Sequence, residues 1–212
     1  MATARPAAGS VTSRRAPTQQ RSRERFARIL DAAAALITDN GVAGLSTRAI
    51  AARAGIPVAS LYQYFADRDE IILALVQRDT AEMDQQVAEA VAALEEPTLR
   101  SLITATMRAF VRVYHRRPAF VMIWWRGRTN RAVVEFCRAH NRQIARTLHD
   151  YATRAGLVDP EVPLRVAELA VEVGDRVFQV AFERDLRGDP WVIEQGIDLV
   201  TGYLERFAAN DA

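Results

Sequence analysis

The sequence of 212 residues contains no lysine, so all 28 of its strongly basic residues are arginines. A GC-rich coding bias is enough to explain this, and the absence of lysine by itself therefore indicates nothing about DNA binding. Cysteine is almost absent as well, because the chain has only Cys137. A single thiol excludes an internal disulfide framework and fits a reducing compartment.

Long apolar runs are also missing. The best of them, such as residues 32–37, have about a third of the roughly 20 apolar residues that a membrane span needs. The pair Arg14 and Arg15 is followed by a polar stretch rather than by the apolar core of an export signal. We therefore expect a cytoplasmic protein with no membrane partner.

Signatures of catalysis are lacking too. The sequence shows no catalytic triad, no phosphate-binding loop and no paired-carboxylate arrangement. Cys137 and His140 stand three residues apart on a predicted helix and could combine with His149, but no fourth metal ligand is evident. A buried helical thiol is also far commoner than a redox sensor. We expect no enzymatic activity, no metal and no cofactor.

The net charge of +2 hides four blocks of alternating sign. Residues 1–65 hold nine arginines against three acids, a net charge of +6, and residues 66–99 hold two against nine, a net charge of −7. Residues 100–146 hold eleven arginines against one acid, a net charge of +10, and residues 147–212 hold six against thirteen, a net charge of −7. The two basic blocks each need an explanation.

Hydrophobic periodicity predicts an all-α protein of about nine helices. Residues 1–20 are rich in Ala, Pro, Ser, Thr and Arg and are expected to form a disordered basic arm. Beyond this arm, no segment of useful length alternates as a half-buried strand would. Breaks at glycine and proline place the helices at residues 21–40, 46–55, 57–64, 67–96, 98–116, 119–127, 131–155, 163–186 and 190–208.

The first three helices have the layout of a helix-turn-helix. Ser46 is a good N-cap, Gly55 permits a left-handed turn, and Pro57 is tolerated in the first turn of the next helix. In such a layout the third helix lies in the DNA major groove. Any small three-helix bundle can have a similar turn, so this spacing alone leaves DNA binding open. We expect a head at residues 21–66 and a ligand-binding and dimerisation body at residues 67–212.

A more specific signal is the run LSTRAIAARAGIPVASLYQYF at residues 45–65, followed by DRDEI at residues 67–71. This run resembles the signature of the tetracycline-repressor (TetR) family, and the match covers about residues 26–75. The family's fold, a small DNA-binding head on a larger helical body, agrees with the predicted layout. The resemblance implies a homodimer that binds a palindromic DNA operator and releases it when a small-molecule effector enters the body.

The resemblance also implies roles for individual residues. Arg48 would read a base edge, since arginine can donate two hydrogen bonds to guanine, and Tyr62 and Tyr64 would bind phosphates. Arg68 stands where the family usually has lysine and can still contact a phosphate. The full set of expected DNA-binding residues is Thr47, Arg48, Val58, Ala59, Ser60, Tyr62, Gln63, Tyr64 and Arg68.

Some of these positions have simpler interpretations. Tyr64 could merely cover the small core, and Leu61 and Phe65 are expected in that core rather than at DNA. The arginines of the first helix could form a solvated face, and Arg14 and Arg15 could be a free tail rather than a minor-groove arm.

Aromatic residues gather in the middle of the body, where the family has its ligand pocket. We expect a ligand wall of Phe110, Tyr114, Trp124, Trp125, Phe136 and Phe178, although an ordinary core is the alternative, which we favour for Phe136. Trp124 and Trp125 are adjacent and cannot face the same way on a helix, so at least one should face a cavity or a partner. The effector could be aromatic or apolar, or anionic.

The anionic alternative comes from two arginine stripes, at residues 108, 112 and 116 and at residues 138, 142 and 146. Like charges repel at this helical spacing, so something must compensate. Acidic positions such as Glu168, Glu172 and Asp175 could pair with them. Alternatively, part of this charge could face the pocket and select an anion.

The last two predicted helices carry apolar stripes wide enough to bury on two sides, and Gly174 and Gly196 would let backbones approach closely. In the family these helices form a four-helix dimer interface, and the pattern permits the same role here. The sequence therefore favours a ligand-responsive dimeric regulator. The alternative is a dimeric helical protein that binds a small molecule without specific DNA binding.

Overall fold

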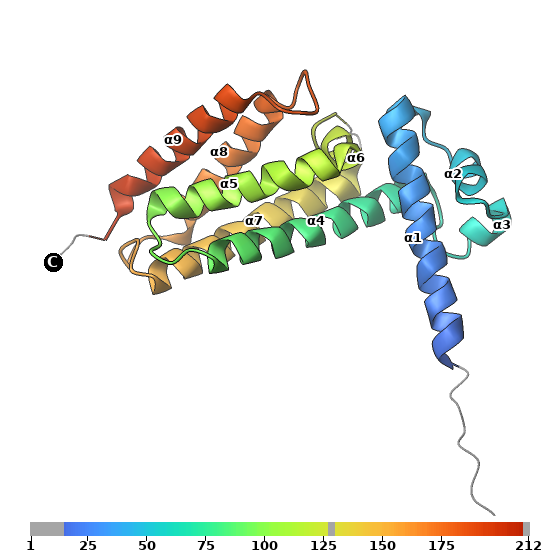
Figure 1. Ribbon diagram of the computed structural model, residues 1–212, viewed down its shortest axis with the longest axis horizontal. Helices are drawn as coiled ribbons and strands as arrows, with labels where there is room; N and C mark the ends of the chain where they lie inside the picture. Colours follow the sequence, from blue (N-terminus) through green and yellow to red (C-terminus); the bar gives the residue numbers. More distant parts are fainter. Residues whose placement is uncertain (1–14, 127–129, 210–212) are drawn as a thin grey trace, which may run out of the picture.

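The computed structural model describes residues 15–126 and 130–209, and over these ranges the chain is helical with no β-strand (Figure 1). This confirms the predicted all-α class. The helices are α1 (Arg15–Asn40), α2 (Thr47–Ala54), α3 (Val58–Leu61), α4 (Arg68–Ala92), α5 (Leu99–Arg116), α6 (Pro118–Val121), α7 (Arg131–Arg154), α8 (Leu164–Ala181) and α9 (Pro190–Leu204).

Several boundaries differ from those expected. Helix α1 begins at Arg15, so the expected disordered arm is helical over residues 15–20, while residues 1–14 lie outside the described ranges. Pro17 falls in the first turn, where a residue without an N–H disrupts no helical hydrogen bond. Helix α8 ends five residues early because the backbone N–H of Asp189 donates to the carbonyl of Ala181 and folds the chain back.

The segment after Pro118 also differs from the single helix expected at residues 119–127. Only Pro118–Val121 is α-helical, and Met122–Arg126 forms a π-helical turn. Such turns are rare and are frequently found at functional sites. This turn carries the two adjacent tryptophans.

The head, made of α1, α2 and α3, stands at one end of the molecule, and α4 leads from it into the body (Figure 1). Helix α4 contacts α1 at its beginning and packs along α5 in the body. Buried apolar side chains continue from one part to the other, because Ile29 of α1 and Phe178 of α8 belong to the same cluster. The head is thus attached to the body through a shared core rather than a free linker.

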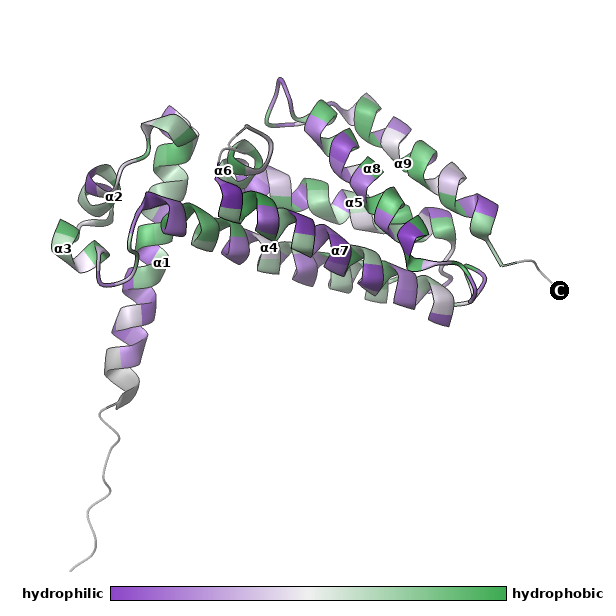
Figure 2. Ribbon diagram, turned by 180° about the vertical axis from the view of Figure 1, so that it is seen from behind, coloured by the Kyte–Doolittle hydropathy of each residue, from purple (hydrophilic) through white to green (hydrophobic). Residues whose placement is uncertain are grey.

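In the body, α5 packs against α4 and α9, while α8 packs against both α7 and α9. Colouring by hydropathy shows mixed polar and apolar surfaces along these helices (Figure 2). Within the described residues no helix is long and apolar enough to cross a membrane.

The contact between α8 and α9 depends on Gly196. A side chain at this buried glycine would run into the methyl groups of Val177, so the two helices approach as closely as expected here. Gly174 behaves differently, because nothing lies within 4 Å of the place where its Cβ would be. The expected close approach is therefore confirmed at Gly196 and wrong at Gly174.

We expect Gly196→Ala to lower the free energy of unfolding by about 1 to 3 kcal/mol, because the added methyl group overpacks the contact with Val177. Urea unfolding at a fixed protein concentration measures this. Combining it with Val177→Ala should restore part of the loss. Gly202→Ala is the matched control, since its Cβ would meet nothing within 4 Å. Equal effects of Gly196→Ala and Gly202→Ala would contradict the packing described.

Candidate functional site

The turn between α2 and α3 has well-defined caps at both ends of α2. The Ser46 hydroxyl accepts a hydrogen bond from the backbone N–H of Ala49 at 3.2 Å, which caps the start of the helix. Gly55 ends the helix with φ of 64°, in the left-handed region that favours glycine. The N–H of Ile56 then donates to the carbonyl of Ala51 at 3.0 Å. These bonds set the direction in which α3 leaves α2.

Helix α3 has a buried face and an exposed face. Leu61 and Phe65 are buried, which confirms their expected place in the core. Val58 and Tyr62 are large side chains left 37% and 53% exposed. Ala59 and Gln63 are exposed beside them, and Ser60 is half-buried. Val58, Ala59, Tyr62 and Gln63 thus project from one end of the head without supporting its core.

The two tyrosine hydroxyls near α3 have partners within the protein. Thr47 Oγ1 and the Tyr62 hydroxyl lie 3.2 Å apart, joining the first residue of α2 to the end of α3. Ser22 of α1 donates to the Tyr64 hydroxyl at 3.3 Å. Tyr64 is half-buried against the core, so covering that core is part of its role. Both tyrosine hydroxyls are held in place by a neighbouring helix.

The two arginines expected at DNA have different surroundings. Arg48 is exposed and has no ion-pair partner within residues 15–126 and 130–209. Arg68 donates to the carbonyl of Leu45 at 3.4 Å, and its Nε lies 3.5 Å from Asp69 Oδ1. On α1, Arg21, Arg23 and Arg28 are exposed. Arg48 is therefore the cation most available to an external partner among those expected to read DNA.

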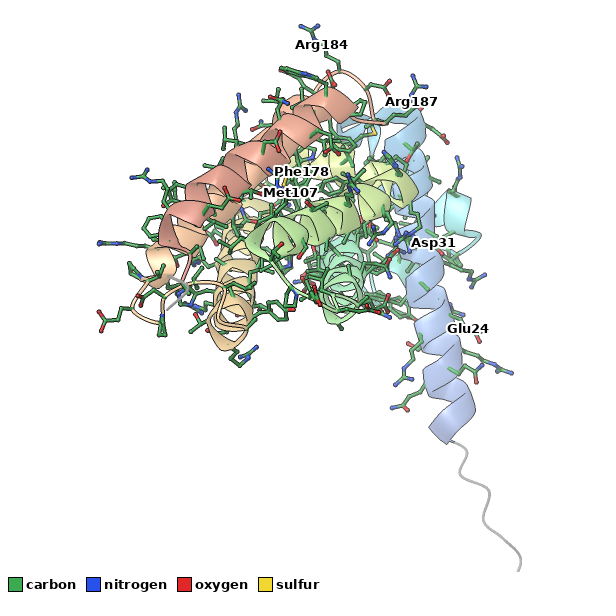
Figure 3. All side chains as sticks on the ribbon, turned by 60° about the vertical axis from the view of Figure 1, so that its left-hand side comes forward. Glu24, Asp31, Met107, Phe178, Arg184 and Arg187 are labelled. Atoms are coloured by element: carbon green, nitrogen blue, oxygen red, sulfur yellow. The ribbon has the colours of Figure 1, made fainter. Side chains whose placement is uncertain are left out.

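A cluster of charged side chains joins the head to the body. Arg78 of α4 bonds Asp31 of α1 at 2.7 Å and its own neighbour Asp79 at 2.9 Å. Arg117, at the start of α6, reaches Glu82 of α4 at 2.7 Å. Asp31 is labelled on α1 in Figure 3, and its bond to Arg78 connects this helix to α4. These ion pairs tie α1, α4 and the α5–α6 junction together.

The two acids of α4 in this cluster respond oppositely to their surroundings. Burial raises the pKa of Asp79, which is only 1% exposed, although Arg78 and Arg117 work to lower it. Burial also works to raise the pKa of Glu82, but hydrogen bonds from Arg117 and Arg116 outweigh it and hold this pKa below its ordinary 4.5. Glu82 is thus the carboxylate of the cluster that the arginines stabilise in its charged form.

A cavity opens inside the body between α5, α7, α8 and α9, with Met83 of α4 at its edge. It contains about 980 Å³ of empty space, counting the part open to solvent. Ligand sites commonly have mostly apolar walls with a few polar groups, and this cavity has such walls. Met107 of α5 and Phe178 of α8 are two of the lining residues, and both are labelled in Figure 3.

Four of the six aromatic residues expected in a ligand wall do line this cavity: Phe110, Tyr114, Trp124 and Phe178. Trp125 and Phe136 do not. Trp125 packs edge-on against Tyr114, with ring centres 6.3 Å apart, and Phe136 stacks on His140 at 6.2 Å. Phe136 is thus an ordinary packing residue, which is the alternative that we favoured for it. Periodicity cannot distinguish these outcomes, because a cavity wall and a core are equally apolar.

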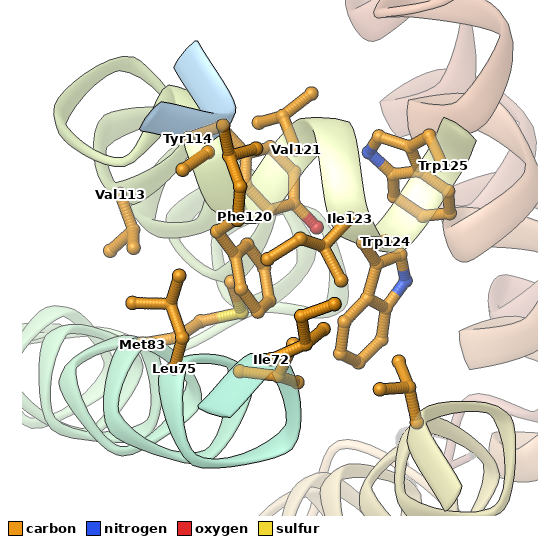
Figure 4. Close-up of a cluster of buried hydrophobic side chains, with 14 of the residues drawn as sticks. Ile72, Leu75, Met83, Val113, Tyr114, Phe120, Val121, Ile123, Trp124 and Trp125 are labelled. Carbon is orange, nitrogen blue, oxygen red and sulfur yellow. The ribbon is translucent and has the colours of Figure 1, made fainter. Parts of the chain in front are cut away.

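Trp124 and Trp125 are both buried and point in different directions from the π-helical turn (Figure 4). Trp124 reaches the cavity and donates its indole N–H to Asp175 at 3.1 Å. The expectation that at least one of the two would face a cavity or a partner is confirmed. Tyr114 lies near Asp175, and burial followed by this charge keeps the pKa of Tyr114 well above its ordinary value.

The remaining lining residues were not expected at a cavity from the sequence. They are mostly aliphatic, and among them are Leu102, Ile103 and Met107 of α5 and Ile144 of α7. Their apolar spacing is visible in the sequence, but it shows only which face is buried. The polar lining residues are Thr106, His140, Asn141, His149 and Asp175.

The residues considered for metal binding have other partners. His140 Nε2 lies 2.8 Å from Asp84 Oδ1, and His149 Nε2 lies 2.8 Å from the carbonyl oxygen of Val162. Cys137 is half-buried on α7. Within the described ranges, no group of three or more potential ligands is arranged to hold a metal ion.

The arginine stripes do not pair with α8 as proposed from the sequence. Arg108 pairs with Glu194 of α9 at 3.2 Å and Arg116 with Glu82 of α4 at 3.0 Å. The α8 acids Glu172 and Asp175 instead accept hydrogen bonds from Asn141 and Trp124. On α7, the arginines at 138, 142 and 146 are exposed and form no ion pair with the rest of the described chain.

Helices α8 and α9 leave large apolar side chains on the surface. Leu169 and Val180 of α8 and Trp191 and Leu199 of α9 are each more than two-fifths exposed, and Trp191 is 69% exposed. Single exposed apolar residues are ordinary, but several on one pair of helices suggest a protein interface.

Family models match both parts of the chain. A model described as "Bacterial regulatory proteins, tetR family" matches residues 29–75, and one described as "Tetracyclin repressor-like, C-terminal domain" matches residues 98–204. The second match covers half of the chain and includes the helices that line the cavity.

Relatives and solved structures agree with these matches. The chain is 37% identical over 79 residues to the uncharacterized HTH-type transcriptional regulator Rv1255c of Mycobacterium tuberculosis, a match covering 37% of this chain and 39% of that protein. It is 33% identical over 78 residues to the HTH-type transcriptional repressor KstR of Mycolicibacterium smegmatis, covering 37% and 38%. The curated relatives are therefore matched over less than half of their length.

A crystal structure of a TetR-family transcriptional regulator from Streptomyces coelicolor superposes with a TM-score of 0.71 and 29% identity. This superposition covers 86% of the chain and 99% of that structure. The likeness therefore extends beyond the head to the body.

The lowered pKa of Glu82 predicts a pH dependence of stability. A carboxylate whose pKa is lower in the folded state stabilises the fold above its ordinary value of 4.5, and this contribution is lost as the pH falls through the folded pKa. We expect Glu82→Gln to lower the free energy of unfolding at pH 7, and this difference from wild type to shrink below pH 4.5. Urea unfolding at several pH values measures it.

Glu89→Gln is a suitable control, because Glu89 is exposed on the same helix and far from the arginine cluster in the sequence. A difference between wild type and Glu82→Gln that stays constant from pH 7 to pH 3 would show that the ion pairs of Glu82 do not stabilise the fold.

Proposed function

Because the chain belongs to the TetR family of bacterial regulatory proteins, we propose that it is a transcriptional repressor controlled by a small molecule. Regulators of this family bind DNA through a helix-turn-helix, and one matched relative is named a repressor. The proposed protein binds a palindromic operator as a homodimer in the cytoplasm, and an effector in the body cavity lowers its affinity for DNA.

The exposed face of the head carries this proposal. Val58, Ala59, Tyr62 and Gln63 contribute little to the core of the head, while the buried Leu61 holds α3 in place beneath them. Two small apolar side chains suit thymine methyl groups, and an amide such as Gln63 can bond adenine. The surrounding net charge of +6 over residues 1–65 favours approach to a polyanion.

Arg48 and the two tyrosines complete the proposed contact surface. Arg48 is exposed at the beginning of α2 and can donate two parallel hydrogen bonds to a guanine. The Tyr62 hydroxyl is held near Thr47, and the Tyr64 hydroxyl accepts a bond from Ser22. Because these hydroxyls are already held in place, less side-chain conformational entropy is lost when they bind a phosphate. Ser60 and Arg68 lie at the margin of this surface, and Arg68 would exchange its weak contact with Leu45 for a phosphate.

Homodimer formation would bury the apolar surface of α8 and α9. Leu169, Val180, Trp191 and Leu199 supply apolar area on these two helices. A symmetric dimer of this kind places two heads side by side, and two recognition helices read half-sites about 34 Å apart. The symmetry of the dimer then explains the palindrome expected in the operator.

Control by an effector would act through the elements shared by the cavity and the head. Met83 of α4 borders the cavity, and one turn earlier on α4 Arg78 and Asp79 belong to the charged cluster that includes Asp31 of α1. A ligand that favours a different position of α4 would thus change the angle of the head. Such a shift requires different affinities of the ligand for the two arrangements.

We expect Arg48→Ala to weaken operator binding by about 1 to 3 kcal/mol for each lost bidentate contact, with the fold unchanged. Tyr62→Phe should weaken binding by a smaller amount that is similar for all DNA sequences, because a phosphate contact carries no sequence information. Binding can be measured with a duplex selected from a random library by the wild-type protein. Arg154→Ala changes an exposed arginine at the far end of α7 and is the control.

Salt provides an independent measurement in the same assay. For a dimer with about 6 to 10 phosphate contacts, affinity should fall roughly 10³- to 10⁵-fold between about 50 and 200 mM salt. If no duplex is selected, or if both variants bind like wild type, the chain is better described as a helical small-molecule-binding protein without specific DNA binding.

The proposed dimer interface predicts that Leu199→Asp produces a monomer, because a charge would be buried without a partner. Sedimentation velocity over a range of concentrations measures the change. Ala139→Asp puts the same charge on an exposed position of α7 and should leave the dimer intact. A dimer of unchanged affinity in Leu199→Asp would place the interface elsewhere.

A further inference from the structure

The cavity is elongated along the helices that enclose it. On α5 its wall extends from Leu99 to Tyr114, a distance of about 22 Å at 1.5 Å per residue. On α7 it extends from His140 to Ala152, and on α8 from Val166 to Phe178, about 18 Å in each case. A molecule that fills this space is therefore long rather than compact.

The two ends of the cavity differ in chemistry. One end is mainly aliphatic: Leu99, Leu102 and Ala152 belong there with Val158 to a separate cluster of buried residues, and the nearby His149 bonds the carbonyl of Val162. The other end has aromatic and polar side chains. Tyr114 and Phe178 meet there edge-on at 5.3 Å, and Trp124 lies edge-on to His140 at 6.3 Å. An occupant would thus have one aliphatic end and one end able to form hydrogen bonds.

No arginine lines the cavity in the described part of the chain, despite the eleven arginines in residues 100–146. The one lining residue there with a formal negative charge, Asp175, offers nothing to attract an anion. Moving an unpaired carboxylate from water into an apolar site is strongly unfavourable. The anionic effector considered from the sequence therefore finds no arginine among the described residues of this wall.

The polar groups of the cavity favour a hydrogen-bond donor. His140 Nε2 lies 2.8 Å from the Asp84 carboxylate, which can only accept, so Nε2 carries a proton. The other ring nitrogen, His140 Nδ1, is buried without a partner among the described groups and is an acceptor in the tautomer that has its proton on Nε2. Asn141 donates its amide to Glu172, which leaves its side-chain oxygen as a second acceptor. The Thr106 hydroxyl is also buried without a partner in the described chain and can accept or donate.

From this geometry we infer that the cavity takes an uncharged, elongated, mainly aliphatic molecule with a hydrogen-bond donor, such as a hydroxyl group, at the aromatic end. The inference rests on the proposed function only in treating the cavity as the effector site. The aliphatic end of the cavity binds the chain, and the acceptors near Trp124 bind the donor. Among the described lining residues, no arginine is present to pair with a carboxylate of the same length.

Binding of straight-chain primary alcohols from hexanol to dodecanol tests this inference, with tryptophan fluorescence as the readout because Trp124 lines the cavity. We expect affinity to rise about fourfold for each added CH₂ group, the factor that corresponds to about 0.8 kcal/mol. Dodecanoate should bind at least tenfold more weakly than dodecanol. The isomeric ether, methyl undecyl ether, has no donor and should bind about three- to tenfold more weakly.

A filling variant shows whether the alcohols occupy this cavity. Gly174 lines it and has open space at its Cβ position, so Gly174→Leu should place a side chain inside and weaken dodecanol binding at least tenfold. Ala139→Leu adds the same residue to the exposed face of α7 and should bind like wild type. Circular dichroism and thermal unfolding check that both variants fold. The ligand series with the wild-type protein tests the inference even if Gly174→Leu does not fold.

Equal or tighter binding of dodecanoate, or an affinity that does not increase with chain length, would overturn the inference. So would unchanged dodecanol binding by a folded Gly174→Leu protein. Operator binding is measured separately in the presence of dodecanol. If dodecanol binds in the cavity but no duplex is bound by the protein, the inference stands and the proposed function fails. If a duplex is bound and only dodecanoate releases it, the inference fails and the proposed function stands.

Discussion

The position of the head relative to the body depends on α4, which packs against α1 at its beginning and against α5 in the body. The first two turns of α4 bury Ile71 and Ile72, and the same apolar cluster continues through Leu75 and Met83 into the body. Burial of apolar surface contributes about 25 cal/mol per Å², so a helix that serves both cores cannot move freely relative to either. The position of the head, the charged cluster beside it and the edge of the cavity all follow from this shared helix.

Two glycines of the body have opposite surroundings, one in a tight helix contact and one beside the cavity. At Gly196 the missing side chain lets α9 come close to Val177 of α8, and the contact has no room to spare. At Gly174, on the same helix as Val177, the missing side chain leaves space that belongs to the cavity. Side chains that line an empty cavity lack dispersion contacts on one side, which lowers stability, so the open space beside Gly174 is more consistent with ligand binding than with a structural role.

The arginines are distributed among several roles. In the head, Arg48 is exposed and free to meet an external anion, whereas Arg78 and Arg117 connect helices across the junction with the body. The arginines of the basic block at residues 100–146 pair mainly with acids of α4 and α9. The other described arginines of this block are exposed to solvent and do not line the cavity. Net charge per segment therefore does not tell which arginines pair within the protein and which stay exposed.

The sequence by itself determined the helical class, most helix boundaries and the turn at Gly55, because capping and apolar periodicity are local and repeat every few residues. It also supplied the family resemblance through residues 45–65. Only the tertiary structure decided that Trp124 faces the cavity while Trp125 and Phe136 do not, and that Arg108 pairs with Glu194. Such outcomes depend on residues far apart in the chain, and an apolar or charged position has the same local pattern whether it meets a core, a partner or an empty space.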